Sequence, residues 1–394
     1  MGHIRERPEG SGTWQLIYDL PRGADGKRKQ SSKTFHGTER QAKRELAQIE
    51  LEIHQGTFCE PTKMNLAQYL DEWMEKYARQ NVSRKTFQEY AQIIKNHIVP
   101  ELGHVPLQKL MPLHILDYQV KMLKNGNLVR EGGLKPTTVV HHYTLLHTAL
   151  GHAVDWMLLN KSPIEKVKPP KAEPYEPNII SISKLSIILK ATEGTDLYVP
   201  IIIAFSAGMR LSEIVGLKWE HVDFDKSTIG VVQKIEQVKE GLFFGPPKSR
   251  SGIRGILMPH YLVYALRKHK TEQAKRRLLL GPAYEDNDLV CPAPDGQIWP
   301  PNRLSKRFST LIKKIGVENL CVPEFRFHDL RHMMASLLED KGVNLKETSQ
   351  RLGHADPAFT LRSYVHASAE SQKEAAELID GLLRDAIKEA SSII

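Results

Sequence analysis

Apolar and polar residues alternate in the first part of the chain, a pattern typical of β-strands. Residues 13–18 (TWQLIY) and 30–35 form two such runs, and the Asp-Gly pair in the basic segment between them is a hairpin-turn signal. A capping-box pattern then predicts a helix that Thr38 caps, that runs to about His54 and that Gly56 ends. We therefore expect a small domain, residues 1–58, made of a β-ribbon and one helix.

Helical spacing replaces this alternation over residues 62–165. The first amphipathic face consists of Leu66, Tyr69, Leu70, Trp73 and Tyr77. Three further amphipathic segments follow, and Pro100 is expected to stop the second of the four helices. Residues 166–178 are rich in proline and lysine, which predicts an extended linker. The pattern thus predicts a helical domain followed by a domain boundary.

Residues 179–394 form the largest predicted domain. Residues 228–238 and 253–258 have the composition of strands, and a hairpin carrying Lys248 precedes the second of them. Helices are expected on either side of these strands, and residues 375–390 form an amphipathic tail helix. The predicted fold class is α+β, mainly α, with a small antiparallel sheet in a mostly helical domain.

The charge of the chain favours an acidic partner. The formal net charge is +9, and residues 61–172 hold most of the excess, with 15 Lys and Arg against 9 Asp and Glu. A solvated surface can carry the same excess, so charge alone does not establish nucleic-acid binding. The basic ribbon could enter a DNA major groove. The expected DNA-binding residues are Arg22, Lys27, Arg28, Lys29 and Lys33 in the ribbon, Arg84 and Lys85 in the helical segment, and Lys168 and Lys171 in the linker.

Cysteine usage and hydropathy limit the compartment. The three cysteines, Cys59, Cys291 and Cys321, are far apart and have neither a metal-binding spacing nor an even number for a disulfide framework. No apolar run approaches about 18 residues, and the N-terminus has no signal-peptide core. We therefore expect a cytosolic protein with no membrane partner.

The segment HDLRH places His328, Arg331 and His332 on one helix face, because they are spaced i, i+3 and i+4. Three interpretations compete. Buried polar networks on core helices commonly contain such residues. Two histidines at i, i+4 also occur in zinc helices, but Asp329 stands where the glutamate base is expected, and Arg331 would oppose a cation. Arginine is, by contrast, the preferred clamp for phosphate oxygens.

The order of the remaining motifs favours phosphate chemistry. The chain presents AGMRLSEIVGLKW, PKSRSGIR, HDLRHMMAS and LGH in sequence, and a tyrosine follows. In this order it resembles the tyrosine recombinase (phage integrase) family over residues 179–366. The ribbon and the helical segment also resemble, by layout, the arm-binding and core-binding domains of phage and conjugative-transposon integrases.

The resemblance implies a nucleophile and its proton-transfer partners. Tyr364 would attack a DNA phosphate, form a 3′-phosphotyrosine and release a 5′-hydroxyl. Because a free tyrosine has a pKa of about 10, it needs a proton acceptor or a strongly stabilised transition state. His328 would assist proton transfer from the tyrosine, and Lys248 would protonate the leaving oxygen.

The resemblance also implies the residues that hold the phosphate. Arg210 and Arg331 would clamp the non-bridging oxygens, and His354 would donate a further hydrogen bond. Glu213 would orient Arg210. Because these charges are fixed, no metal ion is required, and because the phosphotyrosine bond conserves the energy, no ATP is required. No cofactor is therefore expected.

The implied function is site-specific recombination, integrating or excising a phage or mobile element. The implied partners are double-stranded DNA with core-type and arm-type sites, three further copies in a tetramer linked by C-terminal tails, and a host DNA-bending or directionality factor. The implied location is the prokaryotic cytoplasm, at the nucleoid. A type IB-like topoisomerase, a DNA-binding regulator with a relict active site and a zinc hydrolase stay open as alternatives.

Overall fold

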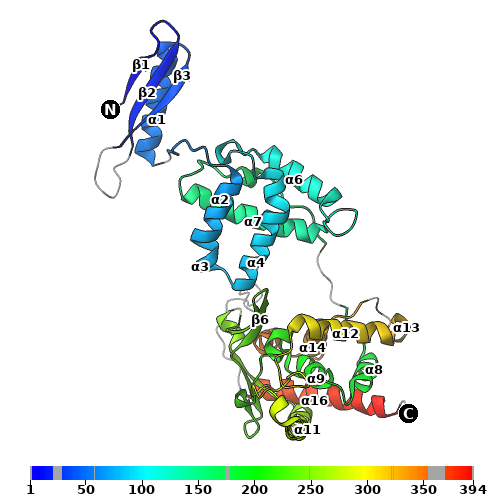
Figure 1. The fold of residues 1–394 in the computed structure, drawn as a ribbon. Helices are drawn as coiled ribbons and strands as arrows, with labels where there is room; N and C mark the ends of the chain where they lie inside the picture. The colour runs from blue at the N-terminus through cyan, green and yellow to red at the C-terminus, as the bar shows by residue number, and fades with distance from the viewer. Residues whose placement is uncertain are drawn as a thin grey trace. The chain divides into compact units, whose positions relative to one another are not determined.

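The computed structural model describes residues 2–20, 29–56, 58–173, 178–247, 249–320, 322, 324–353 and 369–392. The chain divides into two compact units, Met1–Pro174 and Tyr175–Ile394 (Figure 1). The predicted fold class is confirmed, because helices dominate and the sheets are small and antiparallel. The finer division at residues 58 and 166–178 stays a prediction.

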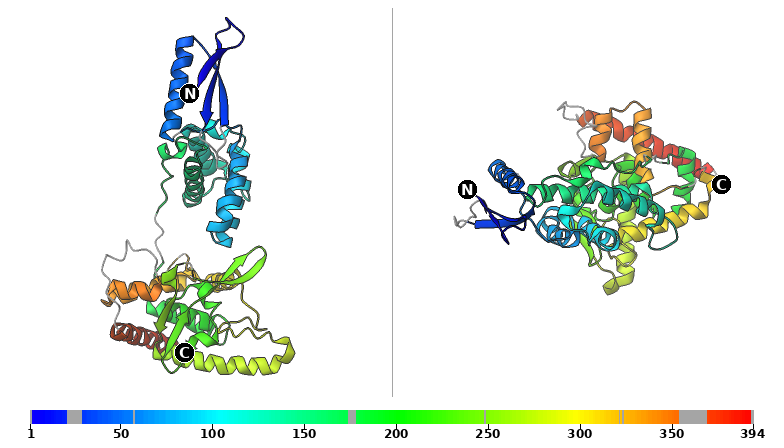
Figure 2. Two further views of the ribbon diagram at one scale, coloured as in Figure 1. Left: turned by 90° about the vertical axis from the view of Figure 1, so that its left-hand side faces the viewer. Right: turned by 90° about the horizontal axis from the view of Figure 1, so that it is seen from above.

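The first unit begins with a three-stranded antiparallel sheet in the order β1-β2-β3, and one helix lies along a face of it (Figure 2). The elements are β1 (His3–Glu6), β2 (Thr13–Leu20), β3 (Lys29–His36) and α1 (Glu39–Gln55). Thr38 and Gln41 form the predicted capping box. Strand β1 was not predicted, because four residues are too few to establish an alternating pattern.

A helical bundle makes up the rest of the first unit. Its elements are α2 (Leu66–Trp73), η1 (Met74–Ala78), α3 (Arg79–Asn81), α4 (Arg84–Ile93), η2 (Ile94–Ile98), α5 (Val99–Leu102), η3 (Leu107–Lys109), α6 (Pro112–Asn125), α7 (Pro136–Asp155) and η4 (Pro163–Lys166). The prediction that Pro100 stops its helix was wrong, since the helix continues to Leu102. A π-helical turn, η2, ends two residues before the proline, and Pro100 lies in the first turn of α5, where proline is tolerated.

The second unit holds the motifs. Its elements are α8 (Ile182–Thr192), α9 (Tyr198–Ala207), α10 (Leu211–Ile214), η5 (Trp219–His221), β4 (Val222–Asp223), β5 (Thr228–Val231), β6 (Lys234–Val238), β7 (Gly241–Gly245), η6 (Arg250–Gly252), β8 (Arg254–Leu257), α11 (His260–Leu280), η7 (Gly281–Ala283), α12 (Pro301–Ile315), α13 (Val317–Leu320), α14 (Asp329–Asp340), α15 (Leu345–Leu352) and α16 (Ala369–Ser392). Nine of the ten residues of α9 are buried, so this helix is the centre of the core.

The strands of the second unit belong to two sheets. One sheet has the order β4-β5-β8, and β6 pairs with β7 as a separate hairpin. The single strand predicted over residues 228–238 is therefore wrong in one respect, because residues 232 and 233 separate β5 from β6. Helix α16 packs along α8 and α11 of its own unit (Figures 1 and 2). Among the side chains of α16 that the structure describes, the buried ones are Ala375, Ala376, Ile379, Asp380, Leu383 and Ala386.

Candidate phosphate-binding site

Arg210 stands at a sharp break between two helices. Helix α9 ends at Gly208, which has a φ of 63°, and Arg210 is the N-cap of α10. A Cβ at Gly208 would overlap the Met334 side chain and lie 2.9 Å from Leu352 Cδ2, so only glycine fits the conformation and the space. The break brings Arg210 to the surface of the unit, where a third of its side chain is exposed.

Glu213 joins Arg210 to a second arginine. Arg210 donates from its backbone N–H and from Nη1 to the Glu213 carboxylate, at 3.0 and 2.9 Å. Arg254 donates from Nη2 to the same carboxylate at 3.0 Å. Burial by itself raises the pKa of Glu213, but the charges and hydrogen bonds of Arg254 and Arg210 outweigh it and lower the pKa. Glu213 is therefore ionised and holds both guanidinium groups.

Arg331, on the first turns of α14, is buried. Its Nη1 donates to the Gly208 carbonyl, and its Nη2 donates to the Leu352 carbonyl at 2.6 Å. Burial, followed by repulsion from Arg210 and Arg254, lowers the pKa of Arg331 to about 9. An anion placed beside this cluster would relieve that repulsion.

Three consecutive backbone carbonyls at the end of α15 accept hydrogen bonds from three arginines. Arg254 Nε donates to Arg351 O at 2.7 Å, Arg331 Nη2 donates to Leu352 O, and Arg210 Nη2 donates to Gly353 O at 3.3 Å. The last carbonyls of a helix lack partners within the helix, and the helix dipole makes this end negative, so it favours positively charged groups. The C-terminal end of α15 thus lies against the arginine cluster.

His328 is exposed at the start of α14, one turn from Arg331. Its ring contacts that of His332 edge-on, with the centroids 4.8 Å apart. Although the residue is exposed, the protein packed around the ring and the charges of His332, Arg331 and Arg210 lower its pKa to about 4. His328 is therefore neutral at pH 7 and able to accept a proton. Within the described ranges, no three His, Cys, Asp or Glu residues converge as metal ligands.

The structure thus brings four of the predicted residues together: Arg210, Glu213, His328 and Arg331. Lys248, His354 and Tyr364 lie outside the described residues. No role was predicted for Arg254, which joins Glu213 to α15 although it is 41 residues from Glu213 and 97 from Arg351. No local spacing connects residues this far apart.

The expected DNA-binding residues fall into two groups. Arg22, Lys27 and Arg28 lie outside the described residues. The others, Lys29, Lys33, Arg84, Lys85, Lys168 and Lys171, are all exposed. Lys33 pairs with Glu45 at 2.7 Å, and Arg84 and Lys85 lie in the first turn of α4.

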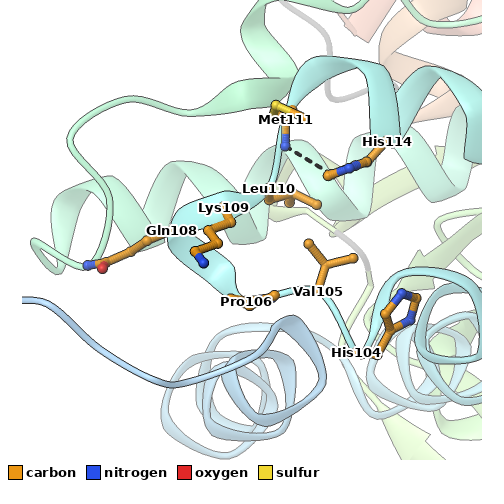
Figure 3. A pocket seen from close by; sticks show the side chains of 8 residues that line it. All are labelled: His104, Val105, Pro106, Gln108, Lys109, Leu110, Met111 and His114. Atoms are coloured by element: carbon orange, nitrogen blue, oxygen red, sulfur yellow. Dashed lines mark hydrogen bonds between the residues drawn. The ribbon is translucent and has the colours of Figure 1, made fainter.

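The first unit also contains a shallow pocket of about 620 Å³, lined by residues between His104 and His114 (Figure 3). The Met111 N–H donates to His114 Nδ1 at 3.2 Å at its edge. None of the predicted site residues lines this pocket, so it takes no part in the phosphate site. No described helix combines the length and the apolar character that crossing a bilayer requires.

Comparison with known proteins identifies the class. Residues 179–371 match the phage integrase family, and residues 65–123 match the phage integrase N-terminal SAM-like domain. The chain is similar to a XerC-like tyrosine recombinase of Caldanaerobacter subterraneus subsp. tengcongensis, with 26% identity covering 91% of this chain and 94% of that protein. It is also similar to an integrase of Streptomyces ambofaciens, with 24% identity covering 88% of each chain.

Solved structures have the same fold. The Tn1549 transposon integrase, solved in complex with a circular intermediate DNA, superposes with a TM-score of 0.63 at 20% identity, covering 80% of this chain and 99% of that one. A lambda integrase tetramer bound to a Holliday junction gives a TM-score of 0.53 at 20% identity, covering 90% and 95%. The chain belongs to the tyrosine recombinase (phage integrase) family, whose members cleave and rejoin DNA strands through a phosphotyrosine intermediate.

Proposed function

We propose that this chain integrates and excises a phage or mobile element by site-specific recombination, with Tyr364 as its nucleophile. The observation that carries the proposal is the cluster of Arg210, Arg331 and Arg254, balanced by the single carboxylate of Glu213. Such a cluster has the charge to bind a phosphodiester. One of its arginines, Arg210, contacts Gly353, which directly precedes His354 in the sequence.

In the proposed cleavage step, Tyr364 Oη bonds to the DNA phosphorus, and the bond from phosphorus to the 5′ oxygen breaks. His328, neutral at pH 7, accepts the tyrosine proton, and Lys248 gives a proton to the 5′ oxygen that leaves. The reverse reaction, with the 5′-hydroxyl of another strand as the nucleophile, rejoins the DNA. The phosphotyrosine bond conserves the energy of the phosphodiester.

Arg210 and Arg331 have donors left for the phosphate. Each of their Nη atoms carries two N–H groups, and the contacts described above use one donor from each. The remaining donors can bind the non-bridging oxygens, where negative charge grows in the transition state. His354 adds a further hydrogen bond. This fixed positive charge takes the role that a metal ion has in many phosphoryl transfers.

We further propose that the first unit selects the DNA. The helical bundle, through Arg84 and Lys85, and the linker, through Lys168 and Lys171, would bind core-type sites. The ribbon, through Lys29 and Lys33, would bind arm-type sites, together with Arg22, Lys27 and Arg28. Phosphate contacts of this kind give affinity that falls with salt. A host DNA-bending or directionality factor would bring the two kinds of site together.

Recombination requires four protomers on two DNA sites. Helix α16 packs on its own unit here, with Ile379 and Leu383 almost fully buried. In the tetramer we propose that this helix docks on the neighbouring protomer, where it would replace that protomer's own copy. The location we propose is the prokaryotic cytoplasm, at the nucleoid.

An adduct trap tests the proposed function. The protein is mixed with fragmented DNA of its source organism and mobile elements, in the presence of EDTA and without ATP. The reaction is quenched with SDS, and the DNA that is covalently linked to the protein is sequenced. We expect adducts at one core site with the wild type and none with Tyr364→Phe. Adducts with the variant would move the nucleophile elsewhere. Binding without adducts in either protein would favour the relict regulator, and adducts without site preference would favour a topoisomerase.

A further inference from the structure

Arg351 connects three elements that meet at the phosphate site. Its Nη2 donates to the carbonyls of Ser206 and Leu257, each at 2.9 Å. Ser206 lies in the last turn of α9, four residues before Arg210, and Leu257 ends β8, three residues after Arg254. Its own carbonyl accepts from Arg254. One residue of α15 therefore holds the ends of α9 and β8.

Stability alone does not account for an arginine at this position. Arg351 is 2% exposed, and its Nε and Nη1 have no hydrogen-bond partner among the residues that the structure describes. Burial lowers its pKa to about 10, so it is still charged at pH 7. A buried cation with unpaired donors is unfavourable, and an apolar side chain of similar volume would commonly be as stable or more stable. What the guanidinium provides is the pair of carbonyl contacts.

These contacts fix the parts that carry the clamp. Helix α9 leads through Gly208 to Arg210, β8 begins with Arg254, and α15 presents the carbonyls that receive all three arginines. A shift between these elements would separate the arginines from one another. Since phosphoryl transfer depends on positioning, a displacement of about 1 Å can lower the rate by about a hundredfold.

We propose that Arg351 is a positioning residue, which locks the ends of α9 and β8 to the end of α15 and so aligns Arg210, Arg254 and Arg331 around one phosphate. The proposal rests on the proposed function, because it assigns Arg351 to the alignment of that clamp. Arg351 acts through the three arginines and makes no contact with DNA.

Three variants test the proposal: Arg351→Met, Arg351→Lys and, as a control on the same helix, the exposed Gln350→Met. Single-turnover adduct formation is measured on the core-site duplex recovered by the adduct trap and corrected for the folded fraction. We expect Arg351→Met to form adducts at least about tenfold more slowly, with the Kd for the duplex within about twofold of the wild type. Arg351→Lys should be intermediate, because an ammonium lacks the planar fork. Gln350→Met should match the wild type.

An adduct rate for Arg351→Met within twofold of the wild type would overturn the proposal. If that variant does not fold, Arg351→Lys is used in its place, and an adduct rate unchanged from the wild type would likewise overturn the proposal. If the wild type itself forms no adduct, the proposed function fails, and hydrogen exchange tests the positioning on its own. Arg351→Met, or Arg351→Lys in its place, should then exchange faster than Gln350→Met at the amides of residues 208–211. Equal exchange at these amides would refute the proposal that Arg351 positions the end of α9.

Discussion

At the residue scale, the candidate site depends on two residues that hold its arginines in place, Gly208 and Glu213. Gly208 allows α9 to stop and Arg210 to start the next helix within two positions. Glu213 keeps Arg210 and Arg254 together despite their like charges. A single substitution at either residue should therefore affect both the stability of the second unit and the geometry of the site.

Gly208→Ala should lower the free energy of unfolding by about 2–4 kcal/mol, because alanine is strained at a φ of 63° and its Cβ would overlap Met334. Denaturant unfolding of the full chain measures the change. Gly255→Ala is the matched control, since a Cβ at Gly255 meets no atom within 4 Å. Equal stability of the two variants would contradict the role of Gly208.

Glu213→Gln should lower the free energy of unfolding by about 3 kcal/mol, because it leaves two buried or half-buried arginines without their carboxylate. Adduct formation should also slow by at least about tenfold, since Arg210 loses the group that orients it. Denaturant unfolding and the single-turnover adduct assay measure the two effects. Glu220→Gln, at an exposed glutamate, should change neither. A variant as stable as the wild type would disprove the role of this carboxylate.

The sequence predicted those residues of the site that lie within a few positions of one another along the chain. His328 and Arg331 share one helix face, and Glu213 is three residues from Arg210, so periodicity alone places each pair. Arg254 and Arg351 could not be predicted in the same way. Their partners are up to 145 residues away, and most of these partners are backbone carbonyls, which every residue type possesses.

At the element scale, the helices were easier to predict than the strands. Helical spacing repeats over ten or more residues, as it does in α1, α7 and α12. Strand β1 and the break between β5 and β6 depend on only a few residues each, and pairing with distant partners decides them. The prediction at Pro100 was wrong because the proline lies in the first turn of α5, where it is tolerated, directly after a run of helix that ends with a π-turn.

The bundle of the first unit contains a histidine that should make its stability depend on pH. His142 of α7 is buried, and its Nδ1 lies 2.8 Å from the Tyr118 hydroxyl oxygen. Burial, and then the neighbouring His97 and His141, lower its pKa to about 4. In the unfolded chain histidine has a pKa of about 6.5. Between about pH 4 and 6.5 the unfolded chain therefore binds more protons than the folded protein.

The contribution of neutral His142 to the free energy of unfolding is therefore fully present above about pH 6.5. As the pH decreases toward 4, the free energy of unfolding falls by up to about 3 kcal/mol. Urea unfolding followed between pH 4 and 7.5 measures the fall. His142→Gln should flatten the profile even if it lowers stability at every pH. His104→Gln, at an exposed histidine, should leave the slope as in the wild type. An unchanged slope in His142→Gln would count against this explanation.

At the scale of the whole molecule, the candidate phosphate site and the predicted arm-binding ribbon belong to different units. All the arginines of the candidate clamp, and all the elements that hold them, belong to the second unit. The ribbon and α1 of the first unit have a small core of their own, with Leu16, Tyr18, Ala42, Leu46 and Ile49. The chemistry should therefore be separable from the recognition of arm-type sites.

Removal of residues 1–56 should leave adduct formation at the core site within about twofold of the wild type, because it removes no residue of the arginine cluster. Integration between two recombination sites should fall at least about tenfold, because in the proposed function that reaction also needs the arm-type contacts. A gel assay of recombinant product, run beside the adduct assay, measures both. Lys29→Gln with Lys33→Gln in the full chain is the matched variant, since it removes charge from the ribbon and keeps its fold. Full integration by the truncated protein would rule out the arm-binding role, whereas loss of adducts would place the ribbon in core-site binding.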